Sequence, residues 1–258
     1  MMNNRTALES FGRLLNIMDE LRTKCPWDKK QTIESLRHLT IEETYELADA
    51  ILENDMNSIR NELGDILLHI VFYAKIASET DDFTIADVID GICKKLVFRH
   101  PHVFGNVPVN DAEDVKVNWE NLKIKEGNKS ILAGVPNSLP ATVKAHRMQD
   151  KARAVGFDWD MREQVWDKIE EELSELKVEI EKMDAEKMES EFGDLFFSII
   201  NAARLYGIDS EAALERTNKK FIKRFNYLEQ QTIKVGRPLT SMTLDEMNEI
   251  WEEAKRMA

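Results

Sequence analysis

Two pairs of acidic residues in the C-terminal half of the chain are spaced so that four carboxylates can meet. Glu172 and Glu175 are three residues apart, and so are Glu191 and Asp194. Side chains three positions apart lie on one face of an α-helix, so each pair forms an acidic stripe. If the two helices fold back on each other, the four carboxylates converge. Because like charges repel strongly away from water, either a cation binds among them or most of them stay solvated.

The same arrangement occurs again in the N-terminal half. The pattern Glu-Glu-x-x-Glu begins at residues 42 and 171, and Glu-x-Gly-Asp begins at residues 62 and 191, a constant offset of 129 (171 − 42 and 191 − 62). Similar segments in the same order indicate a duplicated structural unit. The N-terminal copy of the acidic set consists of Glu43, Glu46, Glu62 and Asp65.

A basic pair follows each acidic set. Lys220 and Arg224 are four residues apart, as are Lys95 and Arg99. Each pair lies on one helix face, and ordinary surface charge is the simplest explanation of a single pair. The repetition next to an acidic cluster favours phosphate ligands instead. A metal site with Lys and Arg is typical of phosphoryl-transfer chemistry.

The ligand types indicate which metal the acidic clusters suit. Carboxylate oxygens favour a hard cation such as Mg²⁺, with Mn²⁺ as a substitute. Di-iron helical bundles use Glu-x-x-His motifs, and none of the five histidines follows a Glu by three residues. The sequence therefore predicts a Mg²⁺ site.

The elements that position these residues are predicted to be helices throughout. All six prolines lie between segments whose apolar residues recur every three or four positions, as in helices. No segment shows the strict alternation of apolar and polar residues that is typical of strands. Thr40 and Thr84 are predicted to cap helices. Gly64 and Gly193, between the acids, predict a close helix contact. The predicted helices are 6–23, 32–53, 56–79, 84–99, 111–125, 140–154, 162–182, 185–206, 210–233 and 243–257.

The chain is predicted to be an all-α protein of two tandem repeats. A segment rich in Gly, Pro, Ser and Asn at 126–138 predicts a linker between an N-terminal repeat at 1–125 and a C-terminal repeat at 139–258.

Composition excludes several classes of partner. The net charge of −13 makes the chain a poor ligand for a nucleic-acid polymer. The sequence contains no run of about 18 apolar residues, the length that a membrane span requires. The N-terminal segment also lacks the apolar core of a secretory signal. Cys25 and Cys93 form no CxxC motif, which predicts reduced thiols in a cytoplasmic protein.

The acidic motifs, together with three further segments, resemble those of the MazG family of all-α nucleoside triphosphate pyrophosphohydrolases. The further segments are Cys25-Pro-Trp-Asp28, Arg99-His-Pro-His-Val-Phe104 and Val155-Gly-Phe-Asp-Trp159. The resemblance covers nearly the whole chain. It implies a Mg²⁺-dependent, cytoplasmic homodimer that hydrolyses nucleoside triphosphates of any base to monophosphate and pyrophosphate, in nucleotide-pool control or house-cleaning.

The resemblance also implies roles for individual residues. The metal ligands are Glu172, Glu175, Glu191 and Asp194, with Glu43, Glu46, Glu62 and Asp65 as their N-terminal equivalents. Glu171 orients or deprotonates the water that attacks the α-phosphorus. Lys187, Lys220 and Arg224 bind phosphate, as do Lys95 and Arg99 in the other repeat. Phe157 and Trp159 pack either against the base or ribose, or in the core.

Three alternatives remain open at this stage: a regulator that binds triphosphates without hydrolysis, a pyrophosphatase specific for dUTP or dCTP, and a structural helical dimer. The sequence also leaves open which repeat is active. Lys187 and Phe157 favour the C-terminal one, since residue 58, at the offset of Lys187, is a serine.

Overall fold

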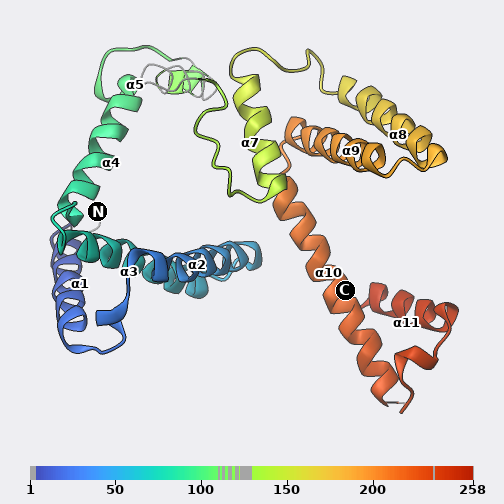
Figure 1. The fold of residues 1–258 in the computed structure, drawn as a ribbon, viewed down its shortest axis with the longest axis horizontal. Helices are drawn as coiled ribbons and strands as arrows, with labels where there is room; N and C mark the ends of the chain where they lie inside the picture. The colour runs from blue at the N-terminus through green and yellow to red at the C-terminus, as the bar shows by residue number, and fades with distance from the viewer. Residues whose placement is uncertain are drawn as a thin grey trace. The chain divides into compact units, whose positions relative to one another are not determined.

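A computed structural model describes residues 4–109, 111, 114–115, 118–119, 122, 130–234 and 236–257. These residues contain helices and no strand, which confirms the predicted all-α class (Figure 1). The helices are α1 (Asn4–Lys24), α2 (Ile33–Glu53), α3 (Met56–Ser78), α4 (Ile85–Arg99), α5 (Pro101–Phe104), α7 (Ala141–Arg153), α8 (Gln164–Lys182), α9 (Ala185–Leu205), α10 (Ser210–Lys234) and α11 (Leu244–Arg256), with 3₁₀ turns η1 (Asp28–Lys30) and η2 (Leu239–Ser241).

The predicted helix boundaries agree with these to within two residues, except at 111–125, which lies largely outside the described residues. Two details were wrong. The single turn α5, which lies outside the predicted helices, begins with proline at its first position, where a missing N–H costs nothing. Thr40 lies inside α2, and the helix is capped instead by Thr32, which accepts a hydrogen bond from the Ser35 N–H. The predicted cap at Thr84 is confirmed.

Contacts divide the chain into two units, Met1–Val109 and Asn110–Ala258, each with one copy of the acidic motifs. In the first unit, α1 and α3 pack together, and the core consists of Met18, Leu36, Val71 and Phe72. In the second unit, α9 packs against both α8 and α7. The extent of the linker, predicted at 126–138, stays a prediction, because 126–129 are not described.

An identical turn joins the two acidic helices in each unit. Asn54 after α2 and Met183 after α8 both adopt the left-handed conformation, with φ of 56°. The next residue, Asp55 or Asp184, caps the following helix with its carboxylate. A non-glycine residue with positive φ is uncommon, and here it closes a tight helical hairpin. The turn fixes the register of α2 against α3 and of α8 against α9.

Several apolar side chains of the second unit remain exposed. On α9 these include Phe192, Phe196 and Ile199, and on α10 they include Phe221 and Ile222. The prediction that Gly64 and Gly193 mark close helix contacts is wrong, since a Cβ at either position would meet no described atom within 4 Å. No described helix is long and apolar enough to span a membrane.

Candidate active site in the C-terminal repeat

The hairpin of α8 and α9 brings together three of the four predicted carboxylates. One oxygen each of Glu172, Glu175 and Glu191 lies within 4.8 Å of the others. Glu172 is only 6% exposed, and a carboxylate is rarely buried to this extent unless it is paired. The α2–α3 hairpin forms the equivalent group from Glu43, Glu46 and Glu62. Both groups could hold a metal ion, because their oxygen ligands are close enough to share one.

The fourth predicted acid of each set, Asp194 or Asp65, is not part of the close group. It is nevertheless near enough to act on it electrostatically. Burial raises the pKa of Glu191, and the charges of Glu175 and Asp194 raise it further. The pKa of Glu43 is raised in the same way, by burial and then by Asp65. Since protons are held more tightly where negative charge collects, a cation would be favoured at both positions.

Lys168 is a member of the site that the sequence interpretation missed. Its Nζ lies 2.8 Å from Glu172 and 3.0 Å from Glu171, one turn further along α8. The hydrogen bond to Glu172, followed by that to Glu171, raises the pKa of Lys168. The i, i+4 spacing from Lys168 to Glu172 was the signal in the sequence. The N-terminal repeat has Leu39 at the same offset of 129 (168 − 39), so only the C-terminal acids have this lysine.

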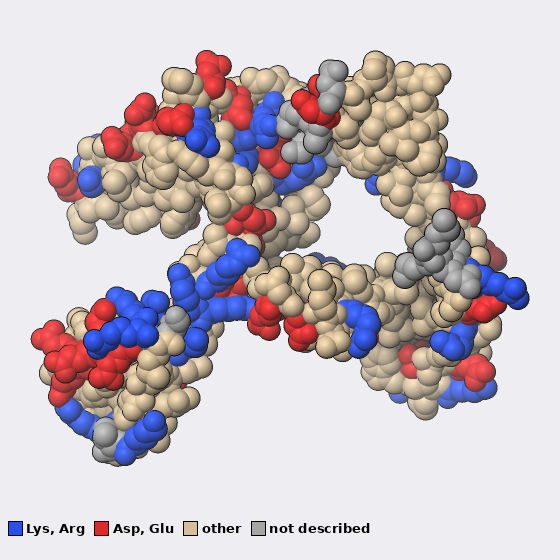
Figure 2. All heavy atoms as spheres, turned by 180° about the vertical axis from the view of Figure 1, so that it is seen from behind, with Lys and Arg blue, Asp and Glu red and all other residues tan. Residues whose placement is uncertain are grey.

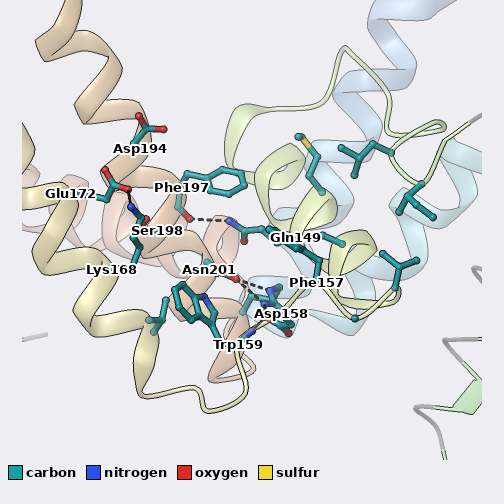
Figure 3. Close-up of a pocket in the computed structure, with 18 residues that line it drawn as sticks. Gln149, Phe157, Asp158, Trp159, Lys168, Glu172, Asp194, Phe197, Ser198 and Asn201 are labelled. Atoms are coloured by element: carbon teal, nitrogen blue, oxygen red, sulfur yellow. Dashed lines mark hydrogen bonds and ion pairs between the residues drawn. The ribbon is translucent and has the colours of Figure 1, made fainter.

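A cavity of about 790 Å³ opens beside the C-terminal acids, within the second unit (Figure 3). Its size is in the range of small-molecule sites. Most of its wall is apolar, from Ile131, Leu132, Met148, Ala152, Val155, Phe157, Val165 and Phe197. Its polar lining consists of Gln149, Asp158, Lys168, Glu172, Asp194, Ser198, Asn201 and Arg204.

A buried ion pair holds the loop at one side of this cavity. Arg204 on α9 donates to both carboxylate oxygens of Asp158, at 3.0 and 2.5 Å. Asp158 stands between Phe157 and Trp159, so the pair positions both predicted base-packing residues at the cavity wall (Figure 3). Phe157 is 81% exposed and therefore is not a core residue. A charged residue in the mostly apolar second half of α9 was the sequence signal for Arg204.

The predicted phosphate-binding residues lie elsewhere. Lys and Arg side chains gather along α10, whereas acidic ones lie over α8 and α9 (Figure 2). Neither Lys220 nor Arg224 is among the described residues that line the cavity. Arg224 lies instead over the ring of Trp251 on α11, 6.0 Å from its centroid. Lys187 is at the start of α9, 3.6 Å from Asp184.

Lys95 and Arg99 are on α4 of the first unit, a helix with no buried residue.

The N-terminal repeat has a packed core where the C-terminal repeat has the cavity. Phe72, at the offset of 129 from Asn201, is 2% exposed and packs with Met18 and Val71. One turn earlier, His69 bonds through Nδ1 to the Thr40 hydroxyl at 2.7 Å. Burial lowers the pKa of His69. The acidic group of this repeat therefore borders a filled interior.

Comparison with known proteins defines the class. A family model described as the MazG nucleotide pyrophosphohydrolase domain matches residues 31–104 and 162–228, which contain the two acidic groups. The chain belongs to this family. The two matches confirm the predicted duplication.

Relatives named for this activity are similar over nearly their full length. A Thermotoga maritima protein named nucleoside triphosphate pyrophosphohydrolase/pyrophosphatase MazG is 44% identical over 250 residues, 95% of both chains. An Escherichia coli K12 protein named nucleoside triphosphate pyrophosphohydrolase is 40% identical over 258 residues, 96% of this chain and 98% of that protein. The Bacillus subtilis protein YabN is 45% identical over 95% of this chain but 51% of its own length.

The crowding of the acids predicts a pH effect on stability in metal-free buffer. The unfolded-state pKa of Glu191 is near the ordinary value of 4.5, and the folded-state pKa is higher. The folded protein therefore binds this proton more tightly, so Glu191 destabilises the fold above its folded pKa and ceases to do so as the pH falls to 4.5. Glu191→Gln is expected to melt at a higher temperature than the unsubstituted protein at pH 7, with a difference that narrows toward pH 4.5.

Thermal unfolding followed by circular dichroism measures this difference. Glu186→Gln, an exposed acid on the same helix outside the cluster, is the matched control and should show no such trend. Equal melting temperatures for Glu191→Gln and the unsubstituted protein at pH 7 would contradict the prediction.

Proposed function

We propose that this chain hydrolyses nucleoside triphosphates to nucleoside monophosphate and pyrophosphate, with Mg²⁺, at the acidic group of its C-terminal repeat. One observation carries the proposal: the carboxylates of α8 and α9 border a largely apolar cavity large enough for a nucleoside. A metal-bound triphosphate at the acids can therefore place its base and sugar out of water. The names of the full-length relatives support the same activity.

The donor set supports Mg²⁺ as the metal, with Mn²⁺ as a substitute, since every candidate ligand is a carboxylate oxygen. Glu172, Glu175 and Glu191 would hold the ion, and Asp194 would join them. When bound, the ion supplies charge neutralisation at the phosphates and lowers the pKa of a coordinated water.

The remaining groups bind and orient the reactants. Glu171 orients the water for attack at the α-phosphorus, and Lys168 holds its carboxylate in place. Lys187 lies one turn before Glu191 and binds the polyphosphate as pyrophosphate departs. Phe157 and Trp159 pack against the base or ribose at the cavity wall. Because every base has a π-face and the wall is mostly apolar, this packing supports broad base tolerance.

The C-terminal repeat is proposed as the active one. Lys168 and the cavity belong to it, whereas the N-terminal acids border the core around Phe72. Glu43, Glu46, Glu62 and Asp65 are proposed as a second metal site that does not carry out hydrolysis.

A homodimer is proposed to complete the site. Lys220 and Arg224 do not line the cavity among the described residues, and apolar side chains on α9 and α10 remain exposed. Burying them against a second copy is favourable, and we propose that this second copy supplies Lys220 and Arg224 to the acids of the first. Mixing Glu172→Gln with Arg224→Ala chains is then expected to restore part of the activity that each lacks alone. Size-exclusion chromatography with light scattering checks the dimer, and the absence of restored turnover would exclude shared sites.

The decisive experiment identifies the products in ¹⁸O-labelled water. Each common ribo- and deoxyribonucleoside triphosphate is incubated with the protein and Mg²⁺. Pyrophosphate together with ¹⁸O-labelled monophosphate is expected for all of them, because attack at the α-phosphorus leaves the label there. Turnover of dUTP or dCTP alone would support a base-specific enzyme. Binding without pyrophosphate release would support a regulator. Cytoplasmic nucleotide-pool control is the proposed cellular role.

A further inference from the structure

Two amides among the residues that line the cavity are each held by one end only, so the other end has no hydrogen-bond partner among the described residues. Gln149 on α7 donates from Nε2 to the backbone carbonyl of Phe197, at 2.9 Å. Its Oε1 is buried and has no hydrogen-bond partner among the described residues. Gln149 is only 6% exposed, so this acceptor lacks ready access to bulk water. An unsatisfied buried acceptor is costly, and such atoms are rare in folded proteins.

Asn201 lies one helical turn beyond Phe197, and its amide is held through the oxygen rather than through the nitrogen. Its Oδ1 accepts hydrogen bonds from Arg204 Nε at 3.0 Å and Nη2 at 2.8 Å. Arg204 is in turn held by Asp158, so the amide cannot flip without losing charged bonds. The Nδ2 donor of Asn201 has no partner among the described residues. Figure 3 shows Gln149 and Asn201 on the facing helices that enclose the cavity.

The position of this pair relative to the acids matches a nucleotide. Asp194, Phe197 and Asn201 follow one face of α9, and Asn201 is seven residues, about 10 Å, along the helix from Asp194. That span is comparable to the reach of a nucleoside from its α-phosphate to the hydrogen-bonding edge of its base. The apolar wall between them would cover the sugar and the faces of the base.

We propose that Gln149 Oε1 and Asn201 Nδ2 form a nucleobase subsite that accepts an N–H from the base and donates to a neighbouring acceptor. The inference rests on the function proposed above. All the common bases carry an N–H donor next to an acceptor on their Watson–Crick edges. One acceptor and one donor can therefore recognise all of them, while excluding bases that lack the N–H. Gln149 and Asn201 would thereby accept all the common bases but require that the Watson–Crick edge of the base is unmodified.

The N-terminal repeat supports the assignment by contrast. The residue at the offset of Asn201 is Phe72 (201 − 129), which is part of the closed core. The repeat with the cavity therefore has a polar residue, Asn201, at this helix position. The repeat with the packed core has an apolar residue, Phe72, there.

The test compares ATP with purine riboside triphosphate, which is ATP without its 6-amino group. For the full chain with Mg²⁺, kcat/KM is expected to be on the order of tenfold lower for the analogue, because Gln149 Oε1 then stays unpaired in the cavity. Gln149→Leu should lower kcat/KM for ATP to about the value for the analogue, and should abolish the difference between them. Inhibition by tripolyphosphate, which has no base, should be unchanged.

Controls separate this subsite from folding and from the proposed function. Gln230→Leu, at an exposed position on α10, should keep the full preference for ATP. Asn201→Ala removes the donor to the ring nitrogen that both nucleotides carry, so it should lower kcat/KM for both and leave the preference for ATP unchanged. Equal kcat/KM for the two nucleotides in the unsubstituted protein would overturn the subsite while leaving the hydrolase proposal intact. If neither nucleotide is hydrolysed, the hydrolase proposal fails. Equilibrium dialysis then tests the subsite by comparing the dissociation constants of ATP and purine riboside triphosphate.

Discussion

Glu172→Gln is expected to lower kcat/KM for pyrophosphate release by at least about 100-fold, while the protein stays folded. Loss of a residue that only supports a metal ligand typically costs 10- to 100-fold, so loss of a buried direct ligand should cost more. Gln keeps the shape of the side chain but removes the negative charge that attracts the ion. The carboxylate is nearly buried and is paired with Lys168, so solvent cannot replace it.

Glu43→Gln is the matched control for this substitution, since Glu43 occupies the equivalent place in the N-terminal repeat. It is expected to retain most of the turnover, because the acids there border a packed core. The paired measurement uses initial rates of pyrophosphate release with saturating Mg²⁺, together with circular dichroism of each variant. If Glu43→Gln inactivates the chain and Glu172→Gln does not, the assignment of the active repeat is reversed.

Arg204→Met should produce the second large effect, a fall of about 2 to 3 kcal/mol in the free energy of unfolding. Removing one member of a buried ion pair leaves the other charge without compensation, which typically costs 3–5 kcal/mol. The expected value is smaller because the Asp158 side chain is 18% exposed and can recruit some water. Urea unfolding followed by circular dichroism measures it. The loop that carries Phe157 and Trp159 also loses its anchor, so KM for nucleotides should rise.

A double-mutant cycle isolates the ion pair from simple loss of packing. Asp158→Asn combined with Arg204→Met removes both charges, so the double variant should be less destabilised than the sum of the single ones. Arg162→Met, which removes an exposed pair with Glu163, should change stability little. Additive effects of Asp158→Asn and Arg204→Met would show that the two side chains are not energetically coupled.

Helix positions and the acidic groups were predictable because they depend on local periodicity. The i, i+3 spacing of Glu172 and Glu175 requires only a helix, and the constant offset of 129 required only two similar segments. The tight turn at Met183 and Asp184 then brings Glu191 opposite them. Local rules failed where two similar patterns compete: Thr40 has a plausible capping sequence, yet the chain begins α2 at Thr32, where Ser35 completes the box.

By itself the sequence determined the all-α class, the duplication, the two carboxylate groups and the resemblance to the MazG family. Only the tertiary structure decided that the two repeats differ inside. The cavity depends on α7 packing beside α9, and on whether residues such as Asn201 or Phe72 meet there. The roles of Gln149, Arg204 and Lys168 also come from contacts across helices or between charged neighbours. A periodic pattern shows which face of a helix is buried, but the volume left between two faces depends on the side chains from both.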